Sequence, residues 1–242
     1  MELFITFLAG ISVLLGALFV KLTSNKEQIE HVSMAMALAA LLALLIFDLF
    51  PEVMESAEKE GWLFCLIMLA IGFVGLVVLD HFVPEHEDNE SNHDTGNAVH
   101  IGLISAMALI VHNIVEGMSV YSMMYSDFNY GVIFAVGIAL HNIPMGMMIY
   151  STMLMQSKRE KMIVFGAVTI STFIGGVLMQ ILSGHFSETV SMGLVAVASG
   201  MILYIVFMEL FPHVLRTKGW KLNLLGAAMG FALVFAASCI GG

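Results

Sequence analysis

Two short polar strings interrupt long apolar stretches of this chain, and their residue types suit metal binding. His112–Gly117 reads HNIVEG, and His141–Gly146 reads HNIPMG. On an α-helix, residues i, i+1 and i+4 share one face, so His112, Asn113 and Glu116 would project together. Imidazole and carboxylate groups bind zinc and its divalent neighbours, and carboxylate and amide oxygens also accept manganese or iron(II). The spacing therefore predicts one half of a metal site on each string.

If the two helices face each other, they offer two imidazoles, one carboxylate and two amide oxygens to a common point. The alternative is that these groups only form hydrogen bonds between helices. Two His-Asn pairs with a glutamate at helical spacing favour a pathway for ions or protons instead. The candidate ligands are His112, Asn113, Glu116, His141 and Asn142, of which the two histidines and the glutamate are the strongest.

The composition indicates that these strings lie in a membrane protein. Hydrophobic residues make up 59% of the 242 residues, charged residues only 12%, and the mean hydropathy is +0.94. Soluble domains carry about 25% charged residues. A transmembrane barrel would alternate apolar with polar residues, which this chain does not do. The net charge of −10 argues against a nucleic-acid partner, and two cysteines support neither a disulfide framework nor a cysteine zinc site.

Apolar stretches of about 20 residues predict an all-α bundle of eight transmembrane helices, in a single domain covering residues 1–242. The predicted spans are Leu3–Val20, Val32–Val53, Trp62–Leu79, Val99–Tyr125, Gly131–Met155, Met162–Leu182, Ser191–Val214 and Leu222–Ile240. The longest connection, about residues 80–97, is rich in acidic residues and histidines, including His86 and His93. It is either a weak metal-collecting segment or a solvated linker.

Basic residues predict the orientation of the spans. All lysines and arginines except Lys59 fall on the side of the first, fifth and seventh connections. Since positive residues gather in cytoplasmic loops, both termini are expected outside the cytoplasm and the loop at about 80–97 inside it. The short loops favour a bacterial inner membrane.

A second pair of matching strings supports an internal repeat. Phe47–Val53 reads FDLFPEV, and Met208–Val214 reads MELFPHV. The partners in both pairs would run in opposite directions, which predicts an inverted repeat of 3+2+3 spans with the site near the membrane midplane. Ionisable residues inside a membrane are costly and mark pathways. Four of them are therefore expected at the two ends of the route: Asp48, Glu52, Glu209 and His213.

These strings, the eight spans and the histidine-bearing loop resemble the ZIP (zinc/iron-regulated transporter-like) family of divalent metal transporters, especially the bacterial members with His-Asn-x-Pro-Glu-Gly on spans four and five. The resemblance implies the five ligands named above. It also implies a homodimer and transport of zinc, or of iron, manganese or cadmium, towards the cytoplasm. We expect one transported dication per chain, no organic cofactor and no enzymatic activity.

The chain departs from the family pattern in three places, the first being Val115, which replaces the proline of the span-four string. Met145 replaces the glutamate of the span-five string, and Thr172 lies in the region of span six where many members carry a further glutamate. Both residues, with His86 and His93, are secondary metal candidates, for which packing or solvation is the simpler explanation. The missing acids leave open a transport-inactive metal-binding protein or sensor. An intramembrane metallohydrolase using the same ligands is a weaker alternative.

Overall fold

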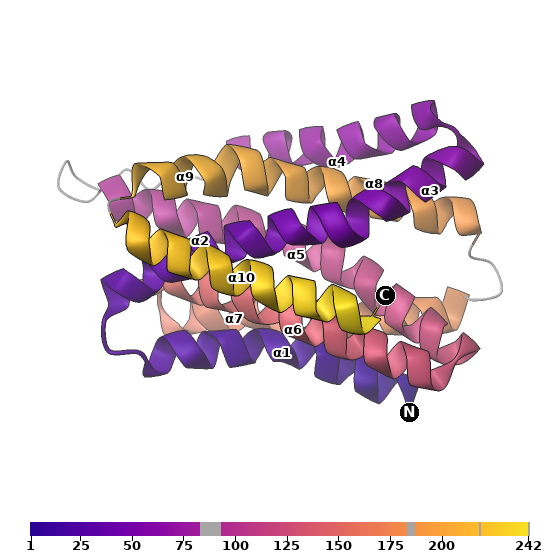
Figure 1. Cartoon of the computed structure of the whole chain (residues 1–242), viewed down its shortest axis with the longest axis horizontal. Coiled ribbons are helices and arrows are strands. Elements are labelled where there is room, and N and C mark those ends of the chain that lie inside the picture. Colours follow the sequence, from indigo (N-terminus) through magenta and orange to yellow (C-terminus); the bar gives the residue numbers. More distant parts are fainter. Residues whose placement is uncertain (83–92, 183–186, 218, 242) are drawn as a thin grey trace.

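The computed structural model describes residues 1–82, 93–182, 187–217 and 219–241, and within them every regular element is helical (Figure 1). The elements are α1 Glu2–Leu22, α2 Lys26–Leu44, η1 Leu45–Leu49, α3 Phe50–Glu60, α4 Trp62–Phe82, α5 His93–Ser126, α6 Phe128–Thr152, α7 Lys158–Leu182, α8 Glu188–Tyr204, η2 Ile205–Leu210, α9 Phe211–Arg216 and α10 Trp220–Gly241, where η marks a π-helix.

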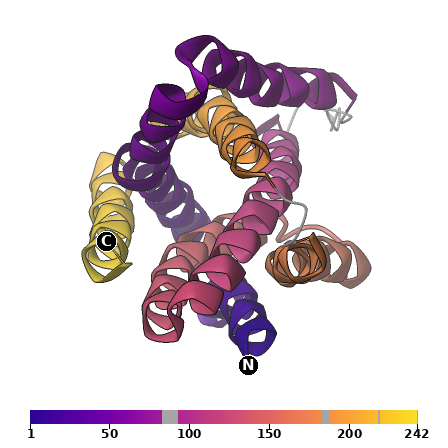
Figure 2. The ribbon, with the colours of Figure 1, turned by 90° about the vertical axis from the view of Figure 1, so that its right-hand side faces the viewer.

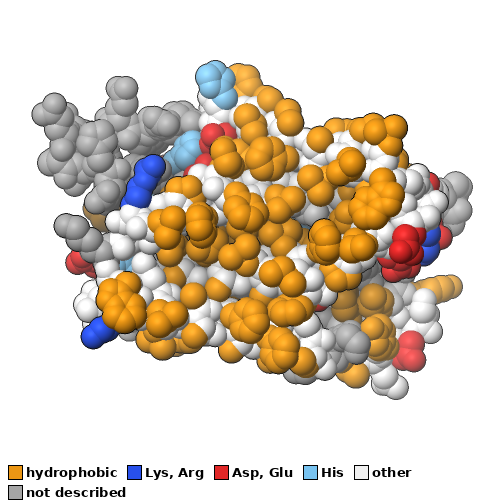
Figure 3. Space-filling view, turned by 45° about the horizontal axis from the view of Figure 1, so that its top comes forward, with side chains coloured by type: hydrophobic (Ala, Val, Ile, Leu, Met, Phe, Trp, Pro, Cys, Tyr) orange, Lys and Arg blue, Asp and Glu red, His pale blue; other side chains and the backbone are white. Residues whose placement is uncertain are grey.

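The described residues contain eight helical stretches long and apolar enough to cross a membrane, which confirms the predicted fold class. Two of the stretches are composite: α2, η1 and α3 form one of 35 residues, and α8, η2 and α9 form one of 29 residues. The helices run along the long axis of the molecule, and both termini lie at the same end (Figure 1). On the face shown in Figure 3, hydrophobic side chains cover the middle of the molecule, and most charged side chains lie towards its two ends.

The connection predicted at about residues 80–97 is shorter than expected. Helix α4 continues to Phe82, so Asp80 and His81 belong to its last turn, and α5 already begins at His93. The last turn of α4 is held in place because Asp80 forms hydrogen bonds with side chains of α5 and α8. His86 lies outside the described residues, as does the side chain of His93.

The contacts between helices divide the bundle into two groups, and Figure 2 shows the bundle from the end that carries the termini. In the first group, α1 packs against α6, α5 against α7, and these pairs against each other. In the second group, α2 packs against α10 and α4 against α8. The groups meet where α6 contacts α2 and α10, and where α5 contacts α8. The pairing suits an inverted repeat, which itself stays a prediction.

Glycines allow the closest helix pairs within the first group. A Cβ atom on Gly117 of α5 would overlap the carbonyl oxygen of Thr172 on α7, and one on Gly175 of α7 would overlap that of Ile114 on α5. Gly146 of α6 faces the backbone of α1 in the same way. Any side chain at these positions would push the helices apart, since the facing atoms belong to the backbone.

In both strings of the second matching pair, a π-helical segment ends directly before the Phe-Pro sequence. The amide of Phe50 bonds to the carbonyl of Leu45, and the amide of Phe211 bonds to that of Val206, five residues back in each case. The following proline has no N–H to continue the regular ladder. Short π-helical segments occur frequently at functional sites, and each of these contains an acidic residue.

Candidate metal centre

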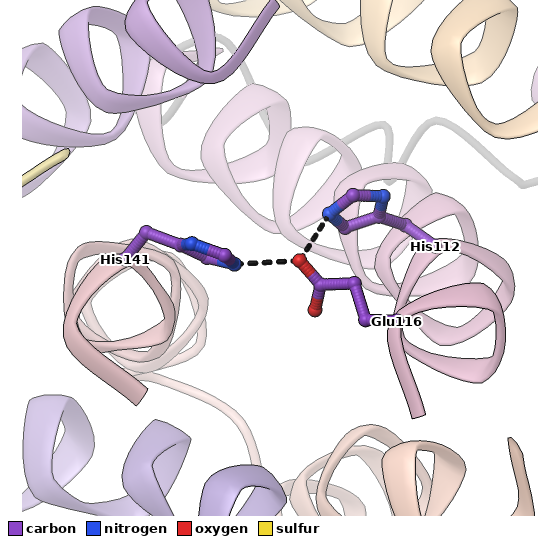
Figure 4. A group of neighbouring side chains, drawn as sticks. All are labelled: His112, Glu116 and His141. Carbon is purple, nitrogen blue, oxygen red and sulfur yellow. Dashed lines mark ion pairs between the residues drawn. The ribbon is translucent and has the colours of Figure 1, made fainter. Parts of the chain in front are cut away.

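Three of the five candidate ligands meet between α5 and α6 (Figure 4). Nε2 of His112 lies 2.9 Å from Oε1 of Glu116, and Nε2 of His141 lies 2.6 Å from the same oxygen. One ligand atom from each residue lies within 4.8 Å of the other two. The three residues are 3%, 8% and 5% exposed, in the order His112, Glu116, His141. We call them the central cluster.

The local sequence explains this arrangement. His112 and Glu116 are one turn apart, so their side chains lie on the same face of α5. Helix α6 packs against α5 and presents His141 from the opposite side (Figure 4). Gly117 follows the glutamate and lets the far side of α5 press against α7. The central cluster is therefore held by helix packing on both sides of α5.

A cavity of about 220 Å³ lies next to the central cluster, which forms part of its wall. Two of the predicted pathway residues, Asp48 and Glu52, line it from the second helix group, together with Ser238 of α10. The Ser238 hydroxyl donates a hydrogen bond of 3.1 Å to Oδ1 of Asp48. Glu52 and Ser238 lie on helix segments near the end that carries the termini, so the cavity extends from the cluster towards that end (Figure 1).

The two asparagines are buried beside the histidines but do not line this cavity. Nδ2 of Asn113 donates a hydrogen bond of 3.2 Å to the carbonyl oxygen of Val168 on α7. Its Oδ1, and Nδ2 of Asn142, have no hydrogen-bond partner among the described residues. Since an unpaired buried polar atom is costly, these amides are candidates to turn towards an ion at the cluster.

Met145 and Thr172 lie away from the cavity. Met145 is 1% exposed and belongs to the main hydrophobic core. Thr172 is fully buried on α7, and its hydroxyl has no hydrogen-bond partner among the described residues. The positions where the resemblance expects two further acids are thus filled by uncharged side chains, so the central cluster has a single carboxylate.

A second cluster lies at the opposite end of the bundle, and the sequence did not predict its full membership. Asp80, His100 and Glu209 each place a ligand atom within 4.8 Å of the others. Nε2 of His100 lies 2.6 Å from Oδ1 of Asp80, and the hydroxyl of Tyr204 donates a 2.7 Å hydrogen bond to Oδ2 of Asp80. We call Asp80, His100 and Glu209 the end cluster.

Of its members, only Glu209 was predicted as a pathway residue. Asp80 was assigned to the connecting loop, and His100 was not singled out. The signal in the sequence was an acidic residue directly after a long apolar run, at the boundary of the membrane. His213, the fourth predicted pathway residue, lies half-buried on α9 and belongs to neither cluster.

Both clusters have the chemistry of a site for a dication such as zinc. Two imidazoles and one carboxylate form the first, and one imidazole and two carboxylates form the second. These ligand types suit zinc and its divalent neighbours. In the central cluster, one carboxylate oxygen contacts two ring nitrogens, and without a cation these nitrogens must carry protons. A metal that binds the same nitrogens would displace those protons. The fold and these sites define a polytopic membrane protein built to handle cations.

Comparisons with known proteins agree with this class. The model of the family described as ZIP zinc transporter matches residues 84–238. A zinc transporter ZupT of Chlorobaculum parvum is 27% identical over 256 residues, which cover 98% of this chain and 95% of the relative. A zinc transporter ZupT of Stenotrophomonas maltophilia is 23% identical over 131 residues, 48% of each protein.

The chain belongs to the ZIP family of zinc transporters. It is therefore a multi-pass membrane protein of divalent metal transport and not an enzyme. Family membership removes the intramembrane metallohydrolase that the sequence had left as an alternative.

Proposed function

We propose that this protein moves zinc across the membrane through the cavity, the central cluster and the end cluster, in that order. The observation that carries the proposal is the position of the central cluster: two imidazoles and one carboxylate, all buried, form part of the wall of a cavity between the two helix groups. Buried ionisable groups of this kind mark ion pathways in membrane proteins.

The direction of transport follows from the charges at the two ends. The cavity extends towards the end with the termini, where Asp48 and Glu52 supply negative charge. Among the described residues, the lysines and arginines other than Lys59 belong to the opposite end, which the positive-inside rule assigns to the cytoplasm. The described conformation is therefore open towards the outside, and zinc would be released at the basic, cytoplasmic end.

The end cluster closes the release side in this conformation. His100 belongs to the first helix group, and Asp80 to the second, so their contact joins the two groups. Release requires that the groups separate here, and the ligands of the end cluster would then receive the ion. Alternation between two packings of helix groups is a common means of transport around a fixed midplane site.

With one carboxylate, the central cluster is proposed to hold one dication at a time. Zinc is the first candidate, and iron, manganese and cadmium are the others that the ligand types admit. A homodimer in a bacterial inner membrane is the proposed state of the protein.

The proposal is tested by measuring zinc uptake into proteoliposomes that contain the wild type or the His112→Ala variant. We expect the variant to lose at least nine-tenths of the initial rate, because one of three ligands of the central cluster is removed. His81→Ala is the matched control, since His81 is exposed at the end of α4 and belongs to neither cluster. Equal rates in wild type and His112→Ala would refute the site. Zinc binding without uptake in the wild type would instead support a metal sensor.

The end cluster makes a separate prediction. Asp80→Asn should reduce zinc uptake about tenfold while leaving the affinity of the central cluster for zinc nearly unchanged, since that cluster is intact. Tyr204→Phe removes the hydroxyl that bonds to Asp80 but leaves all three residues of the end cluster and the edge-on ring contact with Phe73, so its effect on uptake should be smaller. Isothermal titration with zinc and uptake on the same preparations distinguish the two steps. A loss of binding equal to the loss of uptake would contradict the separation.

A further inference from the structure

An apolar groove on the outer face of the first helix group is used by neither cluster. It has a volume of about 470 Å³ and lies where α1, α6 and α7 meet. Its walls include Phe7, Leu14, Tyr150, Lys161, Phe165 and Ile170. Leu14 and Ile170 are almost half exposed, so the groove faces the lipid rather than the interior of the bundle.

One end of the groove is basic. Nζ of Lys161 lies 5.4 Å above the ring of Tyr150 and donates a 2.8 Å hydrogen bond to the carbonyl oxygen of Leu154. Lys26 is near enough to Lys161 to interact with it electrostatically, and its own Nζ caps the end of α1. The side chain of the nearby Glu160 accepts a hydrogen bond from the backbone N–H of Ser157, directly before the start of α7.

The rest of the groove suits a hydrocarbon chain. From Lys161 to Ile170 the groove follows α7 for nine residues, which is about 14 Å along the helix axis. The residues along that length are apolar apart from Thr169, and Gly166 leaves the middle of the wall open, because an added Cβ would meet no atom within 4 Å. The groove thus has a cationic end at the membrane boundary and an apolar body in the hydrocarbon region.

We propose that this groove binds an anionic glycerophospholipid, with the phosphate at Lys161 and Lys26 and one acyl chain lying between α1 and α7. Basic sites between transmembrane helices at the cytoplasmic boundary bind anionic headgroups. A zwitterionic headgroup also carries a positive charge, which the two lysines would repel, so binding of such a lipid is disfavoured. Because α6 contributes Tyr150 here and His141 to the central cluster, the lipid contacts the helix group that carries the zinc site.

The test measures lipid binding to the delipidated, purified protein by native mass spectrometry, with dioleoyl phosphatidylglycerol or dioleoyl phosphatidylcholine added. Lys161→Gln removes the charge, and Gly166→Leu fills the groove without a backbone clash. Lys221→Gln and Gly75→Leu are the matched controls. Lys221 also lies over an aromatic ring, 5.9 Å from that of Trp220, and an added Cβ on Gly75 also meets open space, but neither residue lines the groove.

We expect the wild type to bind the phosphatidylglycerol more tightly than the phosphatidylcholine. Lys161→Gln should weaken that binding about fivefold, and Gly166→Leu should remove it. Both controls should bind as the wild type does. Equal binding of the two lipids would overturn the proposal, as would binding that neither groove variant changes. If Gly166→Leu alters the oligomeric state and leaves lipid binding intact, the groove is an interface between copies of the chain and the proposal fails.

Discussion

Replacing Glu116 with glutamine is expected to abolish zinc transport and to weaken zinc binding by at least about 100-fold. Oε1 of Glu116 is the shared partner of His112 and His141, and the central cluster has no second carboxylate. A glutamine keeps the shape but cannot neutralise a dication. Losing one partner of a buried charge pair costs about 3–5 kcal/mol, which corresponds to a factor of about 100 to several thousand in affinity.

The measurement combines isothermal titration with zinc and uptake into proteoliposomes. Glu116→Gln should remain folded, because the amide can still form hydrogen bonds with the imidazoles, and its unfolding temperature in detergent should stay close to that of the wild type. Glu52→Gln is the comparison, since Glu52 lines the same cavity but is not part of the cluster, and its effect on affinity should be smaller. If Glu116→Gln binds zinc as tightly as the wild type, the central cluster is not the site.

Replacing Gly117 with alanine is expected to impair both stability and transport, although it adds a single methyl group. The new Cβ would overlap the carbonyl oxygen of Thr172, a backbone atom that cannot rotate away. Helix α5 must shift relative to α7, and the shift moves His112 and Glu116 with it. Overpacking of this kind costs about 1–3 kcal/mol.

The matched variant is Gly75→Ala, in a transmembrane helix where an added Cβ meets nothing within 4 Å. Because alanine favours a helix over glycine by about 1 kcal/mol, this variant should be at least as stable as the wild type. Thermal unfolding in detergent compares the stability of the two variants. Zinc uptake then reports whether the displacement of His112 and Glu116 impairs transport. If Gly117→Ala and Gly75→Ala change the unfolding temperature alike, α5 and α7 are not as tightly packed as described.

The helices of this protein were predictable because their signal is local. Each span is a continuous apolar stretch, and apolar length alone decides whether a helix can cross a membrane. The i, i+4 spacing of His112 and Glu116 was equally local, and it correctly placed both side chains on one face of α5. The likeness of the HNIVEG and HNIPMG strings indicated His141 as the partner of His112 and Glu116, although nothing in the spacing required the two helices to touch.

Contacts between distant segments could not be predicted in the same way. Asp80 and His100 were missed because their significance depends on tertiary contacts: α4 places Asp80 next to Glu209 of η2, and α5 supplies His100 from the other helix group. The π-helical segments at Asp48 and Glu209 directly precede two Phe-Pro sequences, and hydrophobic periodicity does not report this change of helix type. The candidate ligands Asn113 and Met145 were judged by residue type, and only the packing showed that Asn113 bonds to α7 and that Met145 lies in the hydrophobic core.

The sequence by itself determined that this is an eight-span helical membrane protein with a histidine- and glutamate-bearing pair of helices, because span length, side-chain chemistry and helical spacing are properties of the chain alone. Only the tertiary structure decided which ligands share one point, that a cavity extends from them towards the end with the termini, and that a second cluster lies at the other end. Those features depend on how two helix groups pack against each other, whereas glycine contacts between backbones set the packing of helix pairs within each group.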